Sequence, residues 1–319
     1  MSPRVSVILP TRNRSHLVGR ALRSALAQTL REIEVRVVVD GPDEATAAVL
    51  ATVADERVHV ETLPERRGHP GALNAGIASA RAPWVAFLDD DDEWMPAKLE
   101  RQIRAAEASS HAEPVVSCRF LARDDRGDRL WPRRVPGPGQ PISEYLFCSR
   151  SPFFGDGLLL NSTLLAPTAL LRRMPFDETL SRHSDLDWCL RASALPSVGV
   201  EFVAGAEPLV VWNGDGTHAR ISAHPDWRFS REWIEGRRTV VTPRAYASFL
   251  LTWVAANAVR QGERGALAGL ARDALRSGRP GPNALVAFVG IACLPRRTRE
   301  SLSFRATRWL RRSATAAGR

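Results

Sequence analysis

The sequence lacks several features that would assign a protein to a class at once. Lys98 is its only lysine, and its four cysteines, at positions 118, 148, 189 and 293, form no CxxC pair. Cysteines spaced in this way suggest neither a zinc site nor a disulfide framework, so we expect reduced thiols. The longest apolar stretch, Ala284 to Leu294, is too short to span a bilayer.

Charge is also unbalanced, with a formal net charge of +9. A basic protein invites a nucleic-acid partner. Nearly all of the positive charge is arginine, however, and the excess lies towards the C-terminal end. We therefore do not expect nucleic acid as a partner. The first four residues run directly into an apolar segment, so we expect no signal peptide and a cytoplasmic protein.

The first hundred residues alternate between strand and helix signals. The expected strands are Val5–Leu9, Glu34–Val39, Val58–Thr62 and Trp84–Leu88. Helices are expected between them, the last at Gly71–Ala80. This alternation predicts an α/β domain with a mostly parallel sheet and flanking helices. Because ligands bind at the carboxyl ends of such strands, Thr11 to Arg14, Asp40 and the run Asp89–Asp92 are expected to face the same site.

The remaining chain is less regular at first and then helical. A segment rich in proline, glycine and arginine, Asp124 to Pro141, predicts an irregular and mobile loop. Short strands and helices return over 151–212, and the pattern is helical from about Pro225. We therefore expect one domain over 1–225, with halves of about 1–120 and 121–225, and a helical extension over 226–319.

Four consecutive carboxylates, Asp89 to Asp92, directly follow the last expected strand of the alternating region. Four like charges repel one another, and a divalent cation would relieve that repulsion. Hard oxygen ligands of this kind suit Mg²⁺ or Mn²⁺. The alternative is a solvated acidic loop whose last carboxylates favour the N-terminus of the helix that starts near Pro96.

Three segments, in this order, resemble the family-two glycosyltransferases. They are VSVILPTRN at Val5–Asn13, VRVVVDG at Val35–Gly41 and GALNAGIASARAPWVAFLDDDDEWMPAKLE at Gly71–Glu100. A fourth runs from Phe176-Asp177-Glu178 to Arg191, so the resemblance covers about residues 4 to 215. It implies a GT-A fold with a Rossmann-like sheet, a nucleotide-sugar donor, and Mn²⁺ or Mg²⁺ as cofactor.

On the donor side, the resemblance implies a nucleotide pocket at the end of the first strand. Its lining residues would be Pro10, Thr11, Asn13 and Arg14. Asp40 would accept a hydrogen bond from the base, unless it only shapes a turn. Asn74 matches the family's asparagine, unless it only caps or packs. Leu73 stands where an arginine usually precedes that asparagine, and Arg66 or Arg67 could supply the missing contact.

The acidic run matches the family's DXD signature. Asp89 and Asp91 correspond to its two ends, and Asp91 is the expected direct metal ligand. Asp90 is expected on the donor side, where small residues are common in the family. Asp92 is an additional metal candidate, and His218 is a candidate third ligand that could equally be an exposed loop residue.

The family's catalytic base corresponds to Asp185, while Ser184 replaces the usual glutamate. The alternative is that Ser184 or Asp185 only caps a helix expected over Leu186–Ala194. Asp187 is the second candidate base. Its spacing from Asp185 directs it to a different side of a helix, so both cannot face one substrate.

These assignments predict a metal-dependent, inverting glycosyltransferase. It would move a sugar to a hydroxyl of a glycan or lipid-linked acceptor, in biosynthesis of cell-envelope polysaccharide, with Asp185 as general base. One alternative is a sugar nucleotidyltransferase, which would want glycines that the loop Pro10–Arg14 lacks. The other is a non-catalytic nucleotide-sugar-binding protein of the same fold.

The C-terminal segment Leu302 to Arg312 places apolar residues, including Trp309, on one helical face and arginines on the other. This pattern is typical of a helix that lies at a membrane surface. The alternative is an amphipathic helix packed on the domain, or a frayed tail. We expect peripheral contact with the inner face of the plasma membrane.

Overall fold

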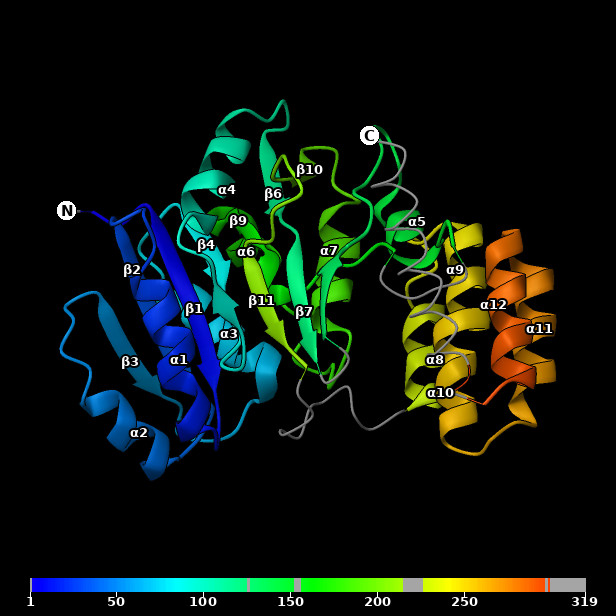
Figure 1. Ribbon diagram of the computed structural model, residues 1–319, viewed down its shortest axis with the longest axis horizontal. Coiled ribbons are helices and arrows are strands. Elements are labelled where there is room, and N and C mark those ends of the chain that lie inside the picture. Colours follow the sequence, from blue (N-terminus) through cyan, green and yellow to red (C-terminus); the bar gives the residue numbers. More distant parts are fainter. Residues whose placement is uncertain (1, 125–126, 152–155, 215–225, 296–297, 299–319) are drawn as a thin grey trace. The chain divides into compact units, whose positions relative to one another are not determined.

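The computed structural model describes residues 2–124, 127–151, 156–214, 226–295 and 298 (Figure 1). The chain divides into two compact units. The first is Met1–Pro138 with Leu158–Ile221, and the second is Gly139–Gly157 with Ser222–Arg319. Each unit is therefore built from two separate stretches of sequence.

The first unit contains a seven-stranded sheet in the order β10-β6-β9-β4-β1-β2-β3. Its strands are β1 Val5–Thr11, β2 Ile33–Val39, β3 Val58–Thr62, β4 Trp84–Phe87, β6 Glu113–Ser117, β9 Leu165–Pro167 and β10 Val198–Phe202. Strand β9 runs antiparallel to β4 and β6, and the neighbouring pairs on either side are parallel. The prediction of a mostly parallel α/β sheet is confirmed.

Helices of the first unit flank this sheet. They are α1 Ser15–Leu26, α2 Glu44–Ala51, α3 Gly68–Ser79, α4 Lys98–Glu107, α6 Thr168–Arg173 and α7 Ser184–Ala192. All seven residues of β1 are buried, as expected for a central strand that is covered on both faces. Helix α3 approaches β1 closely at Gly76, where a Cβ atom would lie 2.5 Å from Cγ2 of Ile8.

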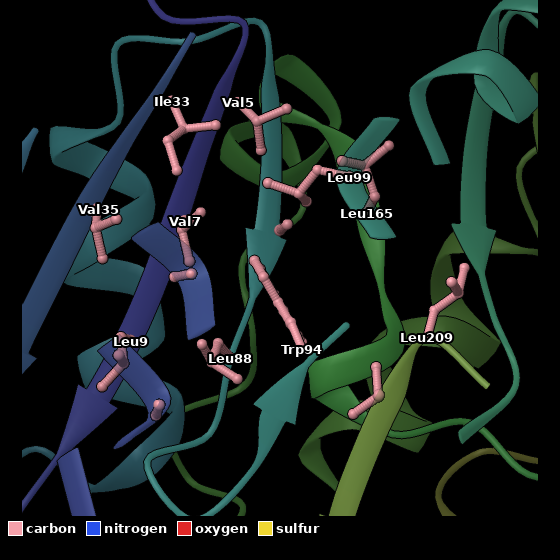
Figure 2. Close-up of a cluster of buried hydrophobic side chains, with 14 of the residues drawn as sticks. Val5, Val7, Leu9, Ile33, Val35, Leu88, Trp94, Leu99, Leu165 and Leu209 are labelled. Carbon is pink, nitrogen blue, oxygen red and sulfur yellow. The ribbon is translucent and has the colours of Figure 1, made fainter. Parts of the chain in front are cut away.

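The core of the first unit joins the sheet to the residues that follow β4. Val5, Val7 and Leu9 project from β1 towards the same cluster as Leu88 and Trp94 (Figure 2). Burial of aliphatic side chains in such clusters contributes about 1.5–3 kcal/mol per side chain. The strand that leads into the acidic run is thus fixed in the best-packed part of the unit.

A second, four-stranded sheet in the order β5-β11-β7-β8 belongs to the same unit. Its strands are β5 Glu93–Trp94, β7 Phe120–Asp124, β8 Gly127–Trp131 and β11 Val210–Asn213. The prediction of an irregular segment from Asp124 is therefore wrong for β8. Trp131 packs edge-on against Phe120, with 6.0 Å between ring centroids. That contact holds β8 against β7. The charged residues of β8 interrupt the alternation of apolar and polar residues by which a strand is predicted.

The second unit is helical in its described part. Its elements are α5 Ile142–Phe147, α8 Trp227–Glu235, α9 Pro243–Phe249, the π-helix Leu250–Val254, α10 Ala255–Arg260, α11 Ala266–Ser277 and α12 Pro282–Cys293. The C-terminal helical region is therefore confirmed. Within the described residues, none of the helices has the length and apolar character to cross a membrane. The basic segment 302–312 lies outside the described residues.

Candidate active site

The acidic run forms a turn directly after β4, and its backbone is held from several elements. The hydroxyl of buried Ser162 accepts a hydrogen bond from the Asp89 amide at 3.0 Å. The carbonyl of Asp91 accepts hydrogen bonds from Arg20 Nη2 and from Asn213 Nδ2, each at 3.0 Å. The sequence analysis assigned no role to Ser162, Arg20 or Asn213. Nothing in their local sequence marks them, because the fold brings them to this turn.

Asp90 connects the acidic turn to the end of β1. Its carboxylate accepts hydrogen bonds from Thr11 Oγ1 at 2.7 Å and from Arg14 Nη1 at 2.8 Å. Burial raises the pKa of Asp90, while Arg14 and Thr11 oppose that shift. Arg14 also lies 3.3 Å from the carboxylate of Asp91. Thr11 and Arg14 thus meet the acidic turn, as expected from neighbouring parallel strands.

The remaining carboxylates of the turn differ in accessibility. The side chains of Asp89 and Asp91 are 32% and 14% exposed, so a ligand can reach them. Asp92 is 1% exposed and lies under the turn, which disfavours it as a metal ligand. Two accessible carboxylates fit Mg²⁺ or Mn²⁺, because these ions commonly take one or two protein carboxylates and complete their shell with substrate phosphates and water.

His69 lies beside this turn, from the first turn of α3. Its Nε2 atom is 3.1 Å from Oδ1 of Asp89. Burial alone would lower the pKa of His69. The hydrogen bond to Asp89 and the charges of Asp89, Asp185 and Asp90 outweigh burial and raise it. No role was predicted for this histidine from the sequence, because it precedes the expected start of the helix at Gly71.

Asp185 belongs to the same electrostatic cluster. Burial raises the pKa of its carboxyl, the charge of Asp89 raises it further, and His69 opposes the shift. The N-cap residue of α7 is His183, which has a left-handed φ of 63° and makes no side-chain capping bond. Asp185 lies inside the first turn and accepts a hydrogen bond from the Leu186 amide at 2.8 Å. Neither Ser184 nor Asp185 is therefore the N-cap of this helix.

Asp187 has a different environment from Asp185. It is fully buried, and Arg191 Nε donates to its Oδ2 atom at 2.7 Å. Arg191 also donates to the carbonyl of Pro175 at 3.0 Å. Asp187 thus anchors α7 to the preceding segment, on a different side of the helix from Asp185.

Asp40 follows β2 and holds the start of α3. Its two carboxylate oxygens accept hydrogen bonds from the backbone amides of Arg67 at 2.6 Å and Gly68 at 3.1 Å. Arg12 donates to the carbonyl of Asp40. Asp40 therefore holds the first turn of α3, which carries His69. It does so whether or not a nucleotide base is bound nearby.

Asn74 and Arg67 link α3 to the fourth motif. The amide nitrogen of Asn74 donates to Phe176 O and to Glu178 Oε1, each at 2.9 Å, and its oxygen accepts from the Phe176 amide at 3.0 Å. Arg67 pairs with Glu178 at 2.6 Å. Both side chains are thus already engaged, whereas Arg66 is exposed.

The other expected donor-side residues lie near the end of β1. Pro10 is buried in the strand beside Val38 of β2. Asn13 is exposed, adopts a positive φ of 53°, and donates its amide to Asp43 at 2.6 Å. His218 lies outside the described residues. Within the described part of the chain, no three histidine, cysteine, aspartate or glutamate side chains are grouped so that they alone could hold a metal.

A mostly parallel sheet, with an acidic turn beside Thr11 and Arg14 and facing a carboxylate on α7, defines a GT-A-type transferase domain. The sequence matches the model of glycosyl transferase family 2 over residues 6–180. The chain belongs to that family. This family assignment counts against the nucleotidyltransferase alternative.

Known relatives support this assignment. The chain is 33% identical over 210 residues to the succinoglycan biosynthesis protein ExoO of Rhizobium meliloti, covering 62% of this chain and 57% of that protein. It is 26% identical over 256 residues to the amylovoran biosynthesis glycosyltransferase AmsB of Erwinia amylovora, covering 76% and 82%. The chain spans little more than half the length of ExoO.

Solved structures show the same fold. The mannosyltransferase PcManGT from Pyrobaculum calidifontis, in complex with GDP-Man and Mn²⁺, has a TM-score of 0.56 at 20% identity, covering 95% of this chain and 84% of that one. S. aureus TarS 1–349, in complex with UDP-GlcNAc, has a TM-score of 0.54 at 19% identity, covering 93% and 82%.

Proposed function

We propose that this glycosyltransferase moves a sugar from a nucleotide-diphosphate donor to a hydroxyl of a glycan or lipid-linked acceptor, with inversion at the anomeric carbon. The observation that best supports the proposal is the pair of accessible carboxylates, Asp89 and Asp91, on the turn after β4, with Asp185 near enough for the charge of Asp89 to raise its pKa. The naming of ExoO and AmsB for succinoglycan and amylovoran biosynthesis supports a role in polysaccharide assembly.

Asp89 and Asp91 would hold Mn²⁺ or Mg²⁺, which, when bound, neutralises negative charge on a leaving diphosphate. Arg14 keeps the Asp91 carboxylate in place through its contact at 3.3 Å. Ser162 and Asn213 hold the backbone of the same turn. The chain thereby presents both carboxylates without having to order them when the donor binds.

Asp185 would accept the proton of the acceptor hydroxyl as its oxygen attacks the anomeric carbon. Asp185 as a residue is only partly buried, which supports access for an acceptor. A raised pKa makes the ionised carboxylate a stronger base, and such assistance typically contributes about 10²–10⁴-fold. Attack from the face opposite the leaving group inverts the anomeric centre.

On the donor side we propose direct and indirect roles. Pro10, Thr11, Asn13 and Arg14 would line the nucleotide. Asp40 and Asn74 act indirectly, because their hydrogen-bonding atoms already hold the start of α3 and the segment at Phe176. Any contact of Asp40 with the base would have to use its remaining lone pairs.

For a lipid-linked acceptor, we further propose that the basic segment 302–312 contacts an anionic leaflet. Its support is the sequence pattern alone. We expect the full chain to sediment with phosphatidylglycerol vesicles, and a chain ending at 298 to sediment less. Equal sedimentation of both chains would remove this part of the proposal.

Thermal unfolding with nucleotides tests the central proposal. UDP, GDP, dTDP and CDP would each be added with and without Mn²⁺ to the wild type, to Asp91→Ala and to the control Asp128→Ala. Asp128 is an exposed carboxylate on β8. A nucleotide at about 100 times its Kd should stabilise the protein by about 2.7 kcal/mol. We expect a Mn²⁺-dependent shift that only Asp91→Ala loses; no shift with any nucleotide would contradict the proposal.

A further inference from the structure

We propose that His69 is a direct ligand of the divalent cation, which makes the acidic turn a mixed carboxylate–imidazole site. This inference rests on the proposed function, because it assumes that Asp89 holds a metal. It concerns the first turn of α3, for which no metal role was predicted from the sequence.

The position of the ring carries the argument. Nε2 of His69 lies 3.1 Å from Oδ1 of Asp89. Two neighbouring ligands of an octahedral cation, each about 2.1 Å from the metal, lie about 3.0 Å apart. The same separation suits a hydrogen bond, which holds the pair together without metal. A cation could therefore take the place of the Nε2 proton, which would pass to water, with little movement of either side chain.

The environment of the ring favours a ligand over a purely supporting residue. A histidine that binds a metal commonly uses its other nitrogen to contact a carboxylate, a carbonyl or water. Within the described part of the chain, the His69 ring has Asp89 as its one hydrogen-bond partner, through Nε2. Its side chain is 26% exposed, so the ring can be reached from solvent.

The backbone that carries His69 is fixed on both sides. Asp40 accepts hydrogen bonds from the amides of Arg67 and Gly68, immediately before the histidine. Gly71 follows in tight contact, since a Cβ atom there would lie 2.5 Å from Cβ of Arg67. The backbone at the start of α3 is thus held in place, and with it the Cα atom from which the imidazole projects, as a ligand position requires.

An imidazole ligand changes which metal the site prefers. Carboxylates alone suit Mg²⁺, whereas an added imidazole nitrogen favours transition metals. We therefore expect the wild type to bind Mn²⁺ more tightly than Mg²⁺ in the presence of nucleotide. In His69→Gln the affinity for Mn²⁺ should fall by roughly tenfold or more, and the affinity for Mg²⁺ should change less.

Pulsed electron paramagnetic resonance of Mn²⁺ gives a direct test. The protein would be labelled with ¹⁵N-histidine and loaded with MnCl₂ and either UDP or GDP. We expect hyperfine coupling from one directly bound histidine nitrogen in the wild type. The coupling should be lost in His69→Gln and retained in the control His59→Gln, on β3. The wild-type spectrum is decisive even if a variant folds poorly.

Two outcomes would overturn the inference while leaving the proposed function in place. One is nucleotide-dependent Mn²⁺ binding in the wild type without coupling to histidine nitrogen. The other is coupling that persists in His69→Gln, which would assign the nitrogen to another histidine, such as His218. If the wild type binds no Mn²⁺ with any nucleotide in the melting experiment, the proposed function itself fails, and this inference fails with it.

Discussion

At the scale of single residues, carboxylates that look alike in the sequence have different surroundings. Asp90 is 4% exposed and bonded to Thr11 and Arg14, whereas Asp89 and Asp91 keep accessible oxygens. The family resemblance named the aspartates that are expected at the site. Their division of roles depends on burial and partners, which a single sequence does not display.

Asp185→Asn should lower turnover by about 10²–10⁴-fold, because the amide cannot accept the acceptor's proton. The Mn²⁺-dependent melting shift with nucleotide should be retained, since the donor site is unchanged. Steady-state kinetics and thermal unfolding measure the two effects. Asp187→Asn is the matched comparison. Its main effect should be a lower free energy of unfolding, because it weakens the ion pair of buried Asp187 with Arg191. Full turnover in Asp185→Asn would contradict the assignment of the base.

The pH dependence of kcat/KM should carry the signature of Asp185. Burial and the charge of Asp89 raise the pKa of its carboxyl, so it stays protonated to a higher pH than an ordinary aspartate. A protonated carboxyl cannot act as base. Activity should therefore fall on the acidic side with a midpoint above about 3.9, the usual value for aspartate. An acidic midpoint at or below that value would exclude Asp185 as the titrating base.

At the scale of elements, the buried parallel strands were predictable and the features at their ends were less so. Strand β1 is buried throughout, so its apolar run is unambiguous. Helix α3 begins at Gly68, three residues before the expected start at Gly71. Glycine and proline suggest a break there, although proline is tolerated in a first turn. The first amides of the helix are capped by Asp40, which directly follows β2 and is far away in the sequence, so the sequence could not place His69 on the helix.

Gly41→Ala should destabilise the first unit more than Gly127→Ala. Both glycines adopt left-handed φ values, 92° and 96°. A Cβ atom at Gly41 would lie 2.8 Å from Arg12 Nη1 and 3.2 Å from the backbone nitrogen of Arg66. A Cβ atom at Gly127 would meet no atom within 4 Å. Backbone strain alone costs about 1 kcal/mol in each variant, and the clash adds to it at Gly41. Urea unfolding of both variants measures the difference, and equal losses would show that the loop absorbs the methyl group.

Lys98 should make the stability of the protein rise with pH. It is fully buried, donates to Gln102 at 2.6 Å, and lies 3.8 Å from the Trp94 ring centroid. Burial lowers the pKa of Lys98 to about 7. Above that pH the unfolded chain binds more protons than the folded one, so stability rises by up to about 1.4 kcal/mol per pH unit.

Urea unfolding at pH 7 and pH 9 would measure this contribution as the difference between wild type and Lys98→Met. We expect the wild type to gain about 2 kcal/mol relative to the variant over that interval. The comparison stops at pH 9, because Cys118, with a pKa raised to about 11 by burial, begins to act in the opposite direction. If the unfolding free energies of wild type and Lys98→Met changed equally with pH, Lys98 would have to be charged and solvated in the folded state.

At the scale of the whole molecule, the sequence predicted a helical C-terminal part but not how the chain reaches it. The expected boundary at 225 lies close to Ser222, where the chain enters the second unit for the second time. The earlier entry, Gly139–Gly157, was placed in the acceptor half of the first domain. Its helix α5 has only six residues, and its partners are about a hundred positions away, so no local pattern marks it.

A chain ending at 221 should therefore be poorly soluble. Phe147 of α5 packs against Phe249 at 4.8 Å and Trp233 at 6.4 Å between ring centroids, and truncation would expose it. Size-exclusion chromatography and binding of a hydrophobic dye would detect the aggregation. Replacing residues 139–157 by a glycine–serine linker in the truncated chain should restore solubility. A truncated chain that is as soluble as the full chain would contradict this account of α5.

The two-stretch construction of each unit also limits how this protein can be recombined. A helical unit made of one continuous segment at the end of the chain could be exchanged between relatives by a single crossover. Here the second unit requires Gly139–Gly157 as well as the residues after Ser222. Chimeras with a single junction would pair α5 of one parent with the helices of the other. Functional hybrids in this family should therefore carry both segments from the same parent.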